Sequence, residues 1–394
     1  MIEAMAATRS RARLNRAQIK ANRIKLGVVG GLVVSLALAL GIVAGSATQV
    51  SPTYDETAAI AAVPPGLSDH ELAGQRFVAG FSGTKVPAKL KKSIRSGRLG
   101  GVILFAENLP SRATARRITR DLQRIERPGK LNEYPLPIMI DQEGGLVKRL
   151  PGAPDFSARQ MGARGPSFAR TQGKRTAKNL KNAGINVDLA PVLDVARPGG
   201  EIADTDRGFG STAKRVSATA IPFSRGLQAN GVAATAKHFP GLGSVTQNTD
   251  DAVQRVELTK AALRKVDEAP YRPFIAAGGE LVMVGTAIYP AFSERPAAFE
   301  KKLATTELRD RLGFEGVTIT DSLEAVAAQS FGSSPRVSLA GAKAGMDILL
   351  FNTYQEALKG EDALAKRLKS GKLDRDDFED AVERILVLRG KFPG

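Results

Sequence analysis

Charged and polar side chains gather at several points of this 394-residue sequence where a short apolar run ends. Asp141 follows the run PIMI, Lys237 and His238 end the run VAATA, and Asp321 follows GVTIT, while the loop DTDRGFG supplies Arg207. Carboxylates can act as nucleophiles or proton donors, and cationic side chains can hold a polar ligand. One such residue alone could simply cap the next helix. Together they predict a site for acid–base or nucleophilic chemistry.

Two residue types are absent or rare in the sequence, and this excludes several kinds of catalytic site. The sequence has no cysteine, which excludes disulfides, a thiolate metal site and a cysteine nucleophile. Its two histidines, His70 and His238, are too few for a three-histidine metal site. No cluster of ligands implies a metal or an organic cofactor, so we expect catalysis without one.

The elements that must position these residues are short apolar runs alternating with longer, helix-compatible stretches. The runs are continuous, as is typical of parallel strands buried on both faces. Eight strands joined by helices such as 111–126 and 167–184 predict a (β/α)₈ TIM-type barrel, an α/β fold with its active site at the C-terminal strand ends. Two amphipathic helices, split at Ser370, should follow. The expected strands are 76–81, 101–108, 137–143, 185–195, 232–239, 281–289, 316–322 and 346–352.

The N-terminal segment differs from the rest of the chain. Seven Lys and Arg residues against Glu3 precede an uncharged apolar run over residues 27–45, which as a helix would measure about 28 Å, close to the thickness of a bilayer. This pattern predicts a signal-anchor with its basic flank in the cytoplasm, although the small residues 45–47 leave a cleaved signal peptide open. We therefore expect a basic cytoplasmic tail (1–25), a signal-anchor or signal peptide (26–47), a linker (48–67) and a barrel with C-terminal helices (68–394).

The formal net charge of +17 concerns partners rather than fold. Export and the lack of a recognition motif argue against nucleic acid as a partner. Outside a cell, positive charge suits a polyanionic wall or an acidic membrane surface, unless it serves only for solubility. We expect a monomer in the bacterial cell envelope, either anchored in the membrane through its N-terminal segment or secreted.

Four motifs carry a resemblance to a known family. DQEGGLVKRL, DTDRGFG, KHFPGLG and TITDSLEA, in this order and spacing, resemble glycoside hydrolase family 3 over roughly residues 68–390. They are most similar to its single-domain β-N-acetylglucosaminidases, because the 73 residues after Asp321 are too few for the second domain of the family's β-glucosidases. The resemblance implies a retaining exo-glycosidase that releases terminal β-linked N-acetylglucosamine, with peptidoglycan fragments as the expected source.

The resemblance also implies a role for each motif residue. Asp321 would be the nucleophile, and Asp141, Arg207, Lys237 and His238 would bind the substrate sugar. A retaining glycosidase needs one ionised carboxylate facing the anomeric carbon and one proton donor near the leaving oxygen. The position of Asp321 at a strand tip agrees with the first requirement, and cations beside it would favour its ionised form.

The sequence departs from the family at the proton donor. The family's acid/base is a histidine in an Asp-(Ser/Thr)-His stretch that begins five residues after the last glycine of KHxPGxG. Counting from Gly243, Asn248 stands at the aspartate position and Asp250 at the histidine position. Either Asp250 or its neighbour Asp251 donates the proton, or turnover is impaired. One alternative is a β-glucosidase or glycoside phosphorylase, since the family includes both. The other is a non-catalytic cell-wall sugar-binding protein that has lost its acid/base histidine.

Aromatic residues give a weaker signal. The sequence has no tryptophan, so stacking on a sugar would fall to a Phe or Tyr side chain, for instance Phe209 or Phe239. Packing of the loops is an equally good explanation of these two rings. Tyr289, after the sixth strand, is expected to shape the pocket wall.

Overall fold

The computed structural model of the protein describes residues 63–392. Within these residues, no helix combines the length and the apolar character needed to cross a membrane. The predicted basic tail, signal-anchor and most of the linker, residues 1–62, lie outside the described part of the chain.

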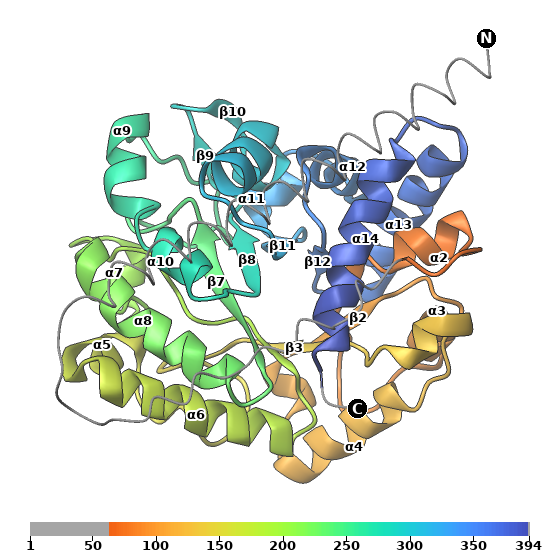
Figure 1. The fold of residues 1–394 in the computed structure, drawn as a ribbon, viewed down its shortest axis with the longest axis horizontal. Coiled ribbons are helices and arrows are strands. Elements are labelled where there is room, and N and C mark those ends of the chain that lie inside the picture. Colours follow the sequence, from red (N-terminus) through yellow and green to blue (C-terminus); the bar gives the residue numbers. More distant parts are fainter. Residues whose placement is uncertain (1–62, 393–394) are drawn as a thin grey trace, which may run out of the picture. The chain divides into compact units, whose positions relative to one another are not determined.

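A parallel barrel of eight strands forms the centre of the described residues (Figure 1). Neighbouring strands of the barrel follow one another along the chain, and a parallel bridge between Ile319 and Ile348 joins the first strand of the sheet order to the last. All eight expected strands are present, although most are shorter than the apolar runs that predicted them. The strands are β1 (Phe77–Ala79), β2 (Gly101–Leu104), β3 (Ile138–Ile140), β6 (Val187–Asp188), β7 (Ala233–Phe239), β8 (Leu281–Val284), β11 (Val317–Thr320) and β12 (Leu349–Phe351).

Each strand is buried on both sides, which explains its continuous apolar sequence. In β1, Val78 belongs to the cluster inside the barrel, whereas Phe77 and Ala79 pack outward against the helices. Ile385 and Leu388 of the last helix pack with the interior cluster. The barrel is therefore filled with side chains, as in other barrels of this type.

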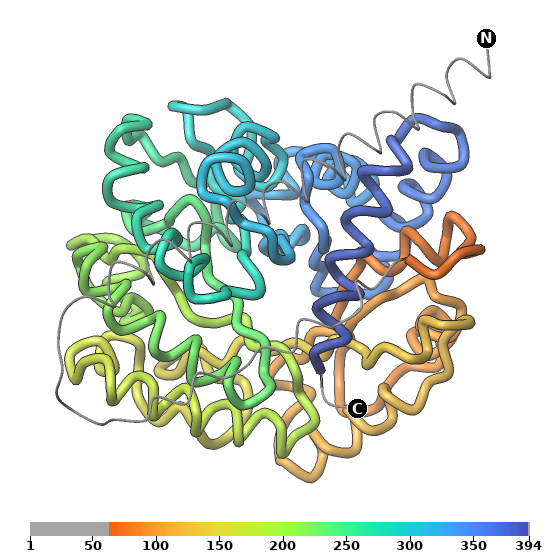
Figure 2. Tube along the Cα trace, in the orientation of Figure 1, coloured from red at the N-terminus to blue at the C-terminus, as the bar shows by residue number. Residues whose placement is uncertain are grey.

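Helices surround the barrel, and the chain passes once around it from α2 back to α13 (Figure 2). The helices expected over 111–126 and 167–184 are present as α4 and α6, and the last two helices are separated near Ser370, as predicted. The longer helices are α3 (Ala88–Arg95), α4 (Arg112–Gln123), α5 (Ala158–Arg164), α6 (Pro166–Asn182), α8 (Ala213–Gln228), α12 (Ser334–Ala344), α13 (Tyr354–Lys369) and α14 (Arg375–Gly390), with a π-helix over Lys302–Arg311.

Short elements occupy the loops between these helices and strands. A hairpin of β4 and β5 follows β3, a second hairpin of β9 and β10 follows β8, and α7 lies in the loop before α8. The short elements are α2 (Asp69–Gly74), β4 (Gln142–Gly144), β5 (Val147–Lys148), α7 (Glu201–Asp204), α9 (Lys260–Ala262), α10 (Tyr271–Ala276), β9 (Ile288–Tyr289), β10 (Ser293–Pro296) and α11 (Val326–Gln329).

Candidate active site

A cavity of about 170 Å³ lies at the C-terminal ends of the barrel strands. Its apolar lining comes from interior residues of the barrel, including Met283 and Leu350. Six of the residues that the sequence singled out as site candidates line it together, from five different loops or strand ends. They are Asp141, Arg207, Lys237, His238, Asp250 and Asp321.

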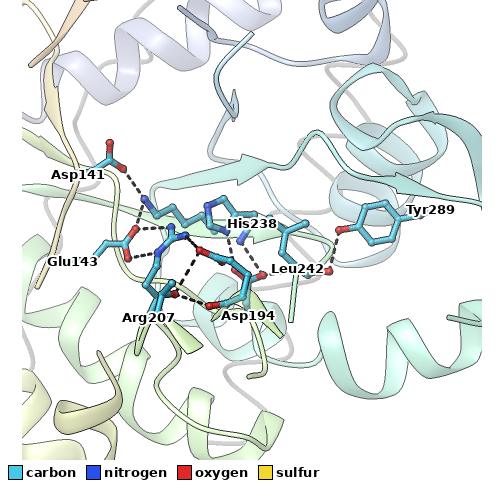
Figure 3. A network of polar contacts seen from close by, with 11 residues as sticks. Asp141, Glu143, Asp194, Arg207, His238, Leu242 and Tyr289 are labelled. Atoms are coloured by element: carbon cyan, nitrogen blue, oxygen red, sulfur yellow. Dashed lines mark hydrogen bonds and ion pairs between the residues drawn. The ribbon is translucent and has the colours of Figure 1, made fainter. Parts of the chain in front are cut away.

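A cluster of alternating charges forms one side of this cavity (Figure 3). The Lys237 ammonium lies 2.6 Å from an oxygen of Asp141 and 2.8 Å from an oxygen of Glu143. Arg207 donates two hydrogen bonds of 2.9 Å to Glu143, in a bidentate arrangement, and lies 3.4 Å from Glu201. We call Asp141, Glu143, Arg207 and Lys237 the cationic side of the cavity, because it contains the buried ammonium group of Lys237 and the largely buried guanidinium group of Arg207.

Mutual neutralisation keeps these groups charged despite their burial. Burial alone would raise the pKa of Glu143, but Arg207 and Lys237 outweigh it and hold that pKa far below its usual range. Burial likewise opposes the charge of Lys237, yet Asp141 and Glu143 outweigh it and raise its pKa. Each charge therefore needs its neighbours, and the cluster is a fixed set of donors and acceptors suited to sugar hydroxyls.

The β4–β5 hairpin positions Glu143. The turn after it uses Gly144 and Gly145, whose φ angles of 97° and 60° favour glycine, and a Cβ atom on Gly144 would lie 2.2 Å from the carbonyl oxygen of Phe156. The buried amide of Gln142 accepts hydrogen bonds from the backbone of the loop that follows the hairpin. The hairpin is thereby fixed over the end of β3.

His238 is held by a carboxylate behind it. Its Nδ1 lies 2.7 Å from an oxygen of Asp194, and the other oxygen of Asp194 accepts the backbone N–H groups of His238 (3.2 Å) and Leu242 (2.7 Å). Asp194 is fully buried. This contact fixes the imidazole ring and the KHFPG loop in one orientation, with the ring lining the cavity.

Asp321 and Asp250 also line the cavity, and we call this pair the carboxylate side. Asp321 directly follows β11, and its carboxylate accepts the N–H of Ser322 at 2.8 Å. No Lys or Arg among residues 63–392 forms an ion pair with it. Lys237 lines the same cavity but is engaged by Asp141 and Glu143.

Asp250 lies on the loop after β7. Its carbonyl oxygen accepts the N–H of Val326 at 3.1 Å, and that of Thr249 accepts the N–H of Ala327, so this loop is tied to the segment that follows Asp321. The residue is exposed at the cavity mouth, but desolvation of its carboxyl group and the nearby charge of Asp321 raise its pKa to about 6. A carboxylic acid with this pKa retains a proton in mildly acidic solution and can donate it.

Comparison with known proteins agrees with the motifs at this cavity. The N-terminal domain of glycosyl hydrolase family 3 matches residues 69–388. The chain belongs to glycoside hydrolase family 3. It is 38% identical over 349 residues to a protein named "uncharacterized secreted glycosyl hydrolase" from Arthroderma benhamiae, covering 86% of this chain and 98% of the relative.

Two further relatives of this family 3 hydrolase have more specific names. A β-hexosaminidase from Thioalkalivibrio sulfidiphilus is 32% identical over 294 residues, which cover 72% of this chain and 82% of the relative. The crystal structure of a β-N-acetylhexosaminidase from Beutenbergia cavernae is similar with a TM-score of 0.76 and 31% identity, covering 82% of this chain and 99% of that one.

Two residues of this site, Glu143 and Asp194, were not predicted from the sequence. Glu143 lies within the quoted motif DQEGG and two positions after Asp141, a spacing that places both side chains on the same side of an extended chain. Asp194 lies within the otherwise apolar stretch 185–195, where a buried carboxylate needs a partner. Both signals were available in the sequence, but neither residue was predicted to have a role.

Phe209, Phe239 and Tyr289 do not line the cavity, so they cannot stack on a sugar there or form its wall. Phe209 packs on Phe223, and Phe239 packs edge-on against Tyr271, so neither ring lines the cavity. Tyr289 is buried and donates a hydrogen bond of 2.9 Å to the carbonyl oxygen of Gly241, which supports the KHFPG loop from behind (Figure 3). These rings pack the loops, whereas the ring of Phe105 lines the cavity.

Asp251, the reserve candidate for the proton donor, is exposed and does not line the cavity. Within residues 63–392, no group of three or more His, Asp or Glu side chains is arranged to hold a metal ion.

Proposed function

We propose that this family 3 hydrolase releases terminal β-linked N-acetylglucosamine with retention of configuration, using Asp321 as nucleophile and Asp250 as acid and base. The observation that carries the proposal is the meeting of these two carboxyl groups at one cavity that is also lined by a cluster able to bind sugar hydroxyls. The relatives named β-hexosaminidase and β-N-acetylhexosaminidase support this choice of sugar.

The first half of the reaction forms a glycosyl-enzyme. The Asp321 carboxylate attacks the anomeric carbon, the bond from that carbon to the leaving oxygen breaks, and Asp250 gives its proton to this oxygen. Asp141, Arg207 and Lys237 hold the sugar hydroxyls during the attack. The departing group leaves as an alcohol, and Asp250 is left as a carboxylate.

The second half of the reaction returns both aspartates to their starting states. The Asp250 carboxylate takes a proton from a water molecule, whose oxygen attacks the anomeric carbon and displaces Asp321. Asp250 now carries the proton again, and Asp321 is ionised. The raised pKa of Asp250 suits both steps, because the group must give up and regain one proton in every cycle.

The natural source of the sugar and the site of action belong to the same proposal. We infer that the substrates are peptidoglycan fragments and that the enzyme acts as a monomer outside the cytoplasm. The basic and apolar N-terminal sequence and the relative named as secreted support export. Fractionation of cells that contain the full-length protein tests this inference, and recovery of the protein from the cytosol would contradict it.

A substrate comparison tests the proposed reaction. The purified protein should hydrolyse an aryl β-N-acetylglucosaminide much faster than the matching β-glucoside, and added phosphate should not change the product. Faster cleavage of the glucoside would favour a β-glucosidase, and a sugar phosphate product would favour a phosphorylase. Binding of N-acetylglucosamine without any turnover would favour a sugar-binding protein that has lost its proton donor.

A further inference from the structure

The positive charge of the described chain is concentrated in one part of the barrel. Residues 85–181 contain 22 Lys and Arg residues against seven Asp and Glu residues, whereas residues 182–392 contain 27 against 28. The first segment includes α3, α4 and α6, which follow one another around the lower edge of the barrel in Figure 1. A charge needed only for solubility has no reason to be confined to neighbouring helices.

Two rows of exposed cations run along α4 and α6. Arg116 and Arg120 are one helical turn apart on α4, as are Lys174 and Lys178 on α6, followed by Lys181. Successive cations in such a row rise about 6 Å along the helix axis. None of these five side chains forms an ion pair with a carboxylate among residues 63–392.

The two rows belong to one surface. The Nε of Arg116 donates a hydrogen bond of 2.6 Å to the carbonyl oxygen of Asn182, the last residue of α6, and Thr119 of α4 donates one to the carbonyl oxygen of Ala183. These contacts hold the C-terminal end of α6 against α4. We call the surface formed by Arg116, Arg120, Lys174, Lys178 and Lys181 the basic face.

A surface cavity of about 440 Å³ lies on this face where α6 ends. Asn230, which follows α8, contributes an amide group from the other wall. The lining contains four cations and two amide side chains but no carboxylate. Arg175 is paired with Asp155 outside the lining at 2.7 Å, and the Asn230 amide donates to the carbonyl oxygen of Gly226, so the available donors are the ammonium groups of the three lysines. The lining residues are Lys174, Arg175, Lys178, Lys181, Asn182 and Asn230.

We propose that the basic face binds a linear polyanion whose charges are phosphate groups, with the cavity at the end of α6 as its main anchoring site. Three ammonium groups without a carboxylate partner among residues 63–392, lining one hollow, can contact the several acceptor oxygens of a phosphate. The rows of cations on α4 and α6 then follow the remaining charges of the polymer. This binding would keep the enzyme on an anionic matrix without occupying the catalytic cavity, which the residues of the basic face do not line.

A polymer fits this face better than a lipid surface does. Proteins that lie on a membrane usually add apolar side chains to their cations, to insert between the lipids. The large apolar side chains that are exposed within residues 63–392 are Leu146, Val253, Val326 and Val387, and none belongs to α4 or α6. A hollow lined with donors also matches a flexible chain that can enter it, rather than a flat sheet of head groups.

The test compares two triple variants of the full-length protein in binding to long-chain inorganic polyphosphate. The first variant neutralises the face with Lys174→Gln, Lys178→Gln and Lys181→Gln. The second is a matched control that removes the same charge elsewhere, with Lys265→Gln, Arg272→Gln and Lys369→Gln, three exposed cations that also lack a carboxylate partner within the described residues. The seven cations before residue 26 are the same in both variants.

The face variant should bind polyphosphate roughly tenfold more weakly than the wild type at low salt, and the slope of log affinity against log salt should fall by about 2. The control variant should bind as the wild type does, and both should hydrolyse aryl glycosides normally, so the result is independent of the proposed reaction. Equal weakening in both variants would overturn the proposal in favour of total charge alone. A face variant that loses binding to phosphatidylglycerol vesicles but keeps its affinity for polyphosphate would overturn it in favour of a membrane.

Discussion

The carboxyl groups on the two sides of the cavity differ in whether a cation neutralises them. On the cationic side, Asp141 and Glu143 share Lys237, and Glu143 also binds Arg207 through both oxygens. On the carboxylate side, Asp250 and Asp321 have no ion-pair partner among residues 63–392, and each increases the negative charge around the other. The cavity therefore combines a neutralised cluster with an unneutralised pair.

Under the proposed function, this difference separates the groups that bind the sugar from the groups that react with it. Cations lower the pKa of Glu143 so strongly that its charge is constant in ordinary buffers, and a constant charge is useful for fixing a ligand. Desolvation and Asp321 raise the pKa of Asp250 to about 6, where a small change in surroundings adds or removes its proton. An ion pair in a cavity thus marks a binding position, and a carboxyl group without a cation marks a candidate for chemistry.

The largest effect is expected from Asp321→Asn. The amide has the same shape but cannot form the covalent intermediate, so kcat/KM should fall roughly 10⁴-fold or more. Folding and sugar binding should persist, because the cationic side is intact. Steady-state kinetics and a binding assay measure the two properties on one preparation. The control is Asp204→Asn, an exposed residue outside the cavity, which should keep wild-type activity. Near-normal turnover of Asp321→Asn would refute the assignment of the nucleophile.

The next effect is expected from Asp250→Asn and depends on the leaving group. Hydrolysis of disaccharides, whose leaving alcohol must be protonated, should slow by about 10²–10⁴-fold, the usual range for a general acid. Aryl glycosides with leaving groups of low pKa should be affected much less in bond cleavage. For these substrates the slow step becomes removal of the glycosyl group, and azide, which needs no base, should restore turnover.

Asp251→Asn is the matched control for this prediction. The neighbouring carboxyl group is exposed and lies outside the cavity lining, so its removal should leave the leaving-group dependence unchanged. If Asp250→Asn slowed all substrates by one modest factor and azide had no effect, Asp250 would be a loop-capping residue. The same pattern of rescue in Asp251→Asn would transfer the role to that residue.

The cationic side should respond through stability as well as binding. Glu143→Gln leaves Arg207 and Lys237 without their shared anion, and loss of one partner of a buried ion pair costs about 3 kcal/mol, near the low end of the usual range. The low end applies because Lys237 keeps Asp141 and Arg207 keeps Glu201. Because the folded-state pKa of Glu143 is depressed, this stabilisation is present above the ordinary glutamate pKa and is lost as the pH falls below it.

Denaturant unfolding of wild type and Glu143→Gln at several pH values measures this difference. The gap between the two proteins should be constant near neutrality and should narrow below about pH 4. Glu201→Gln is the control, because its contact with Arg207 is longer, at 3.4 Å, and its side chain is less buried. A gap that widened on acidification would contradict the depressed pKa of Glu143.

Some parts of the fold and the site could be predicted from the sequence, and others could not. The strands were predictable because burial on both faces requires continuous apolar runs, and Asp141, Lys237, His238 and Asp321 were predictable because barrel sites lie at strand ends. The partners of Glu143 were not predictable, since Lys237 reaches it from a strand almost a hundred residues away. For Phe209 and Phe239 the sequence left stacking and loop packing equally open, because the side to which a loop aromatic turns is decided by the residues packed behind it, which leave no local pattern.

The smallest effect, and the most specific for the carboxylate side, is expected in the pH dependence. Asp250 must carry its proton when the leaving group departs, and its pKa is raised to about 6. The protonated fraction is nearly complete below this pH and falls tenfold for each pH unit above it, so kcat/KM for a substrate with a poor leaving group should decline above about pH 6. In Asp250→Asn this decline should disappear and the residual rate should be flat, because no titrating proton donor is left.

Asp251→Asn should keep the wild-type decline within a few tenths of a pH unit, since removing an exposed neighbouring charge changes the field at Asp250 only slightly. A decline that persisted unchanged in Asp250→Asn would mean that another group supplies the proton, and the raised pKa of Asp250 would then reflect its proximity to Asp321 and nothing more.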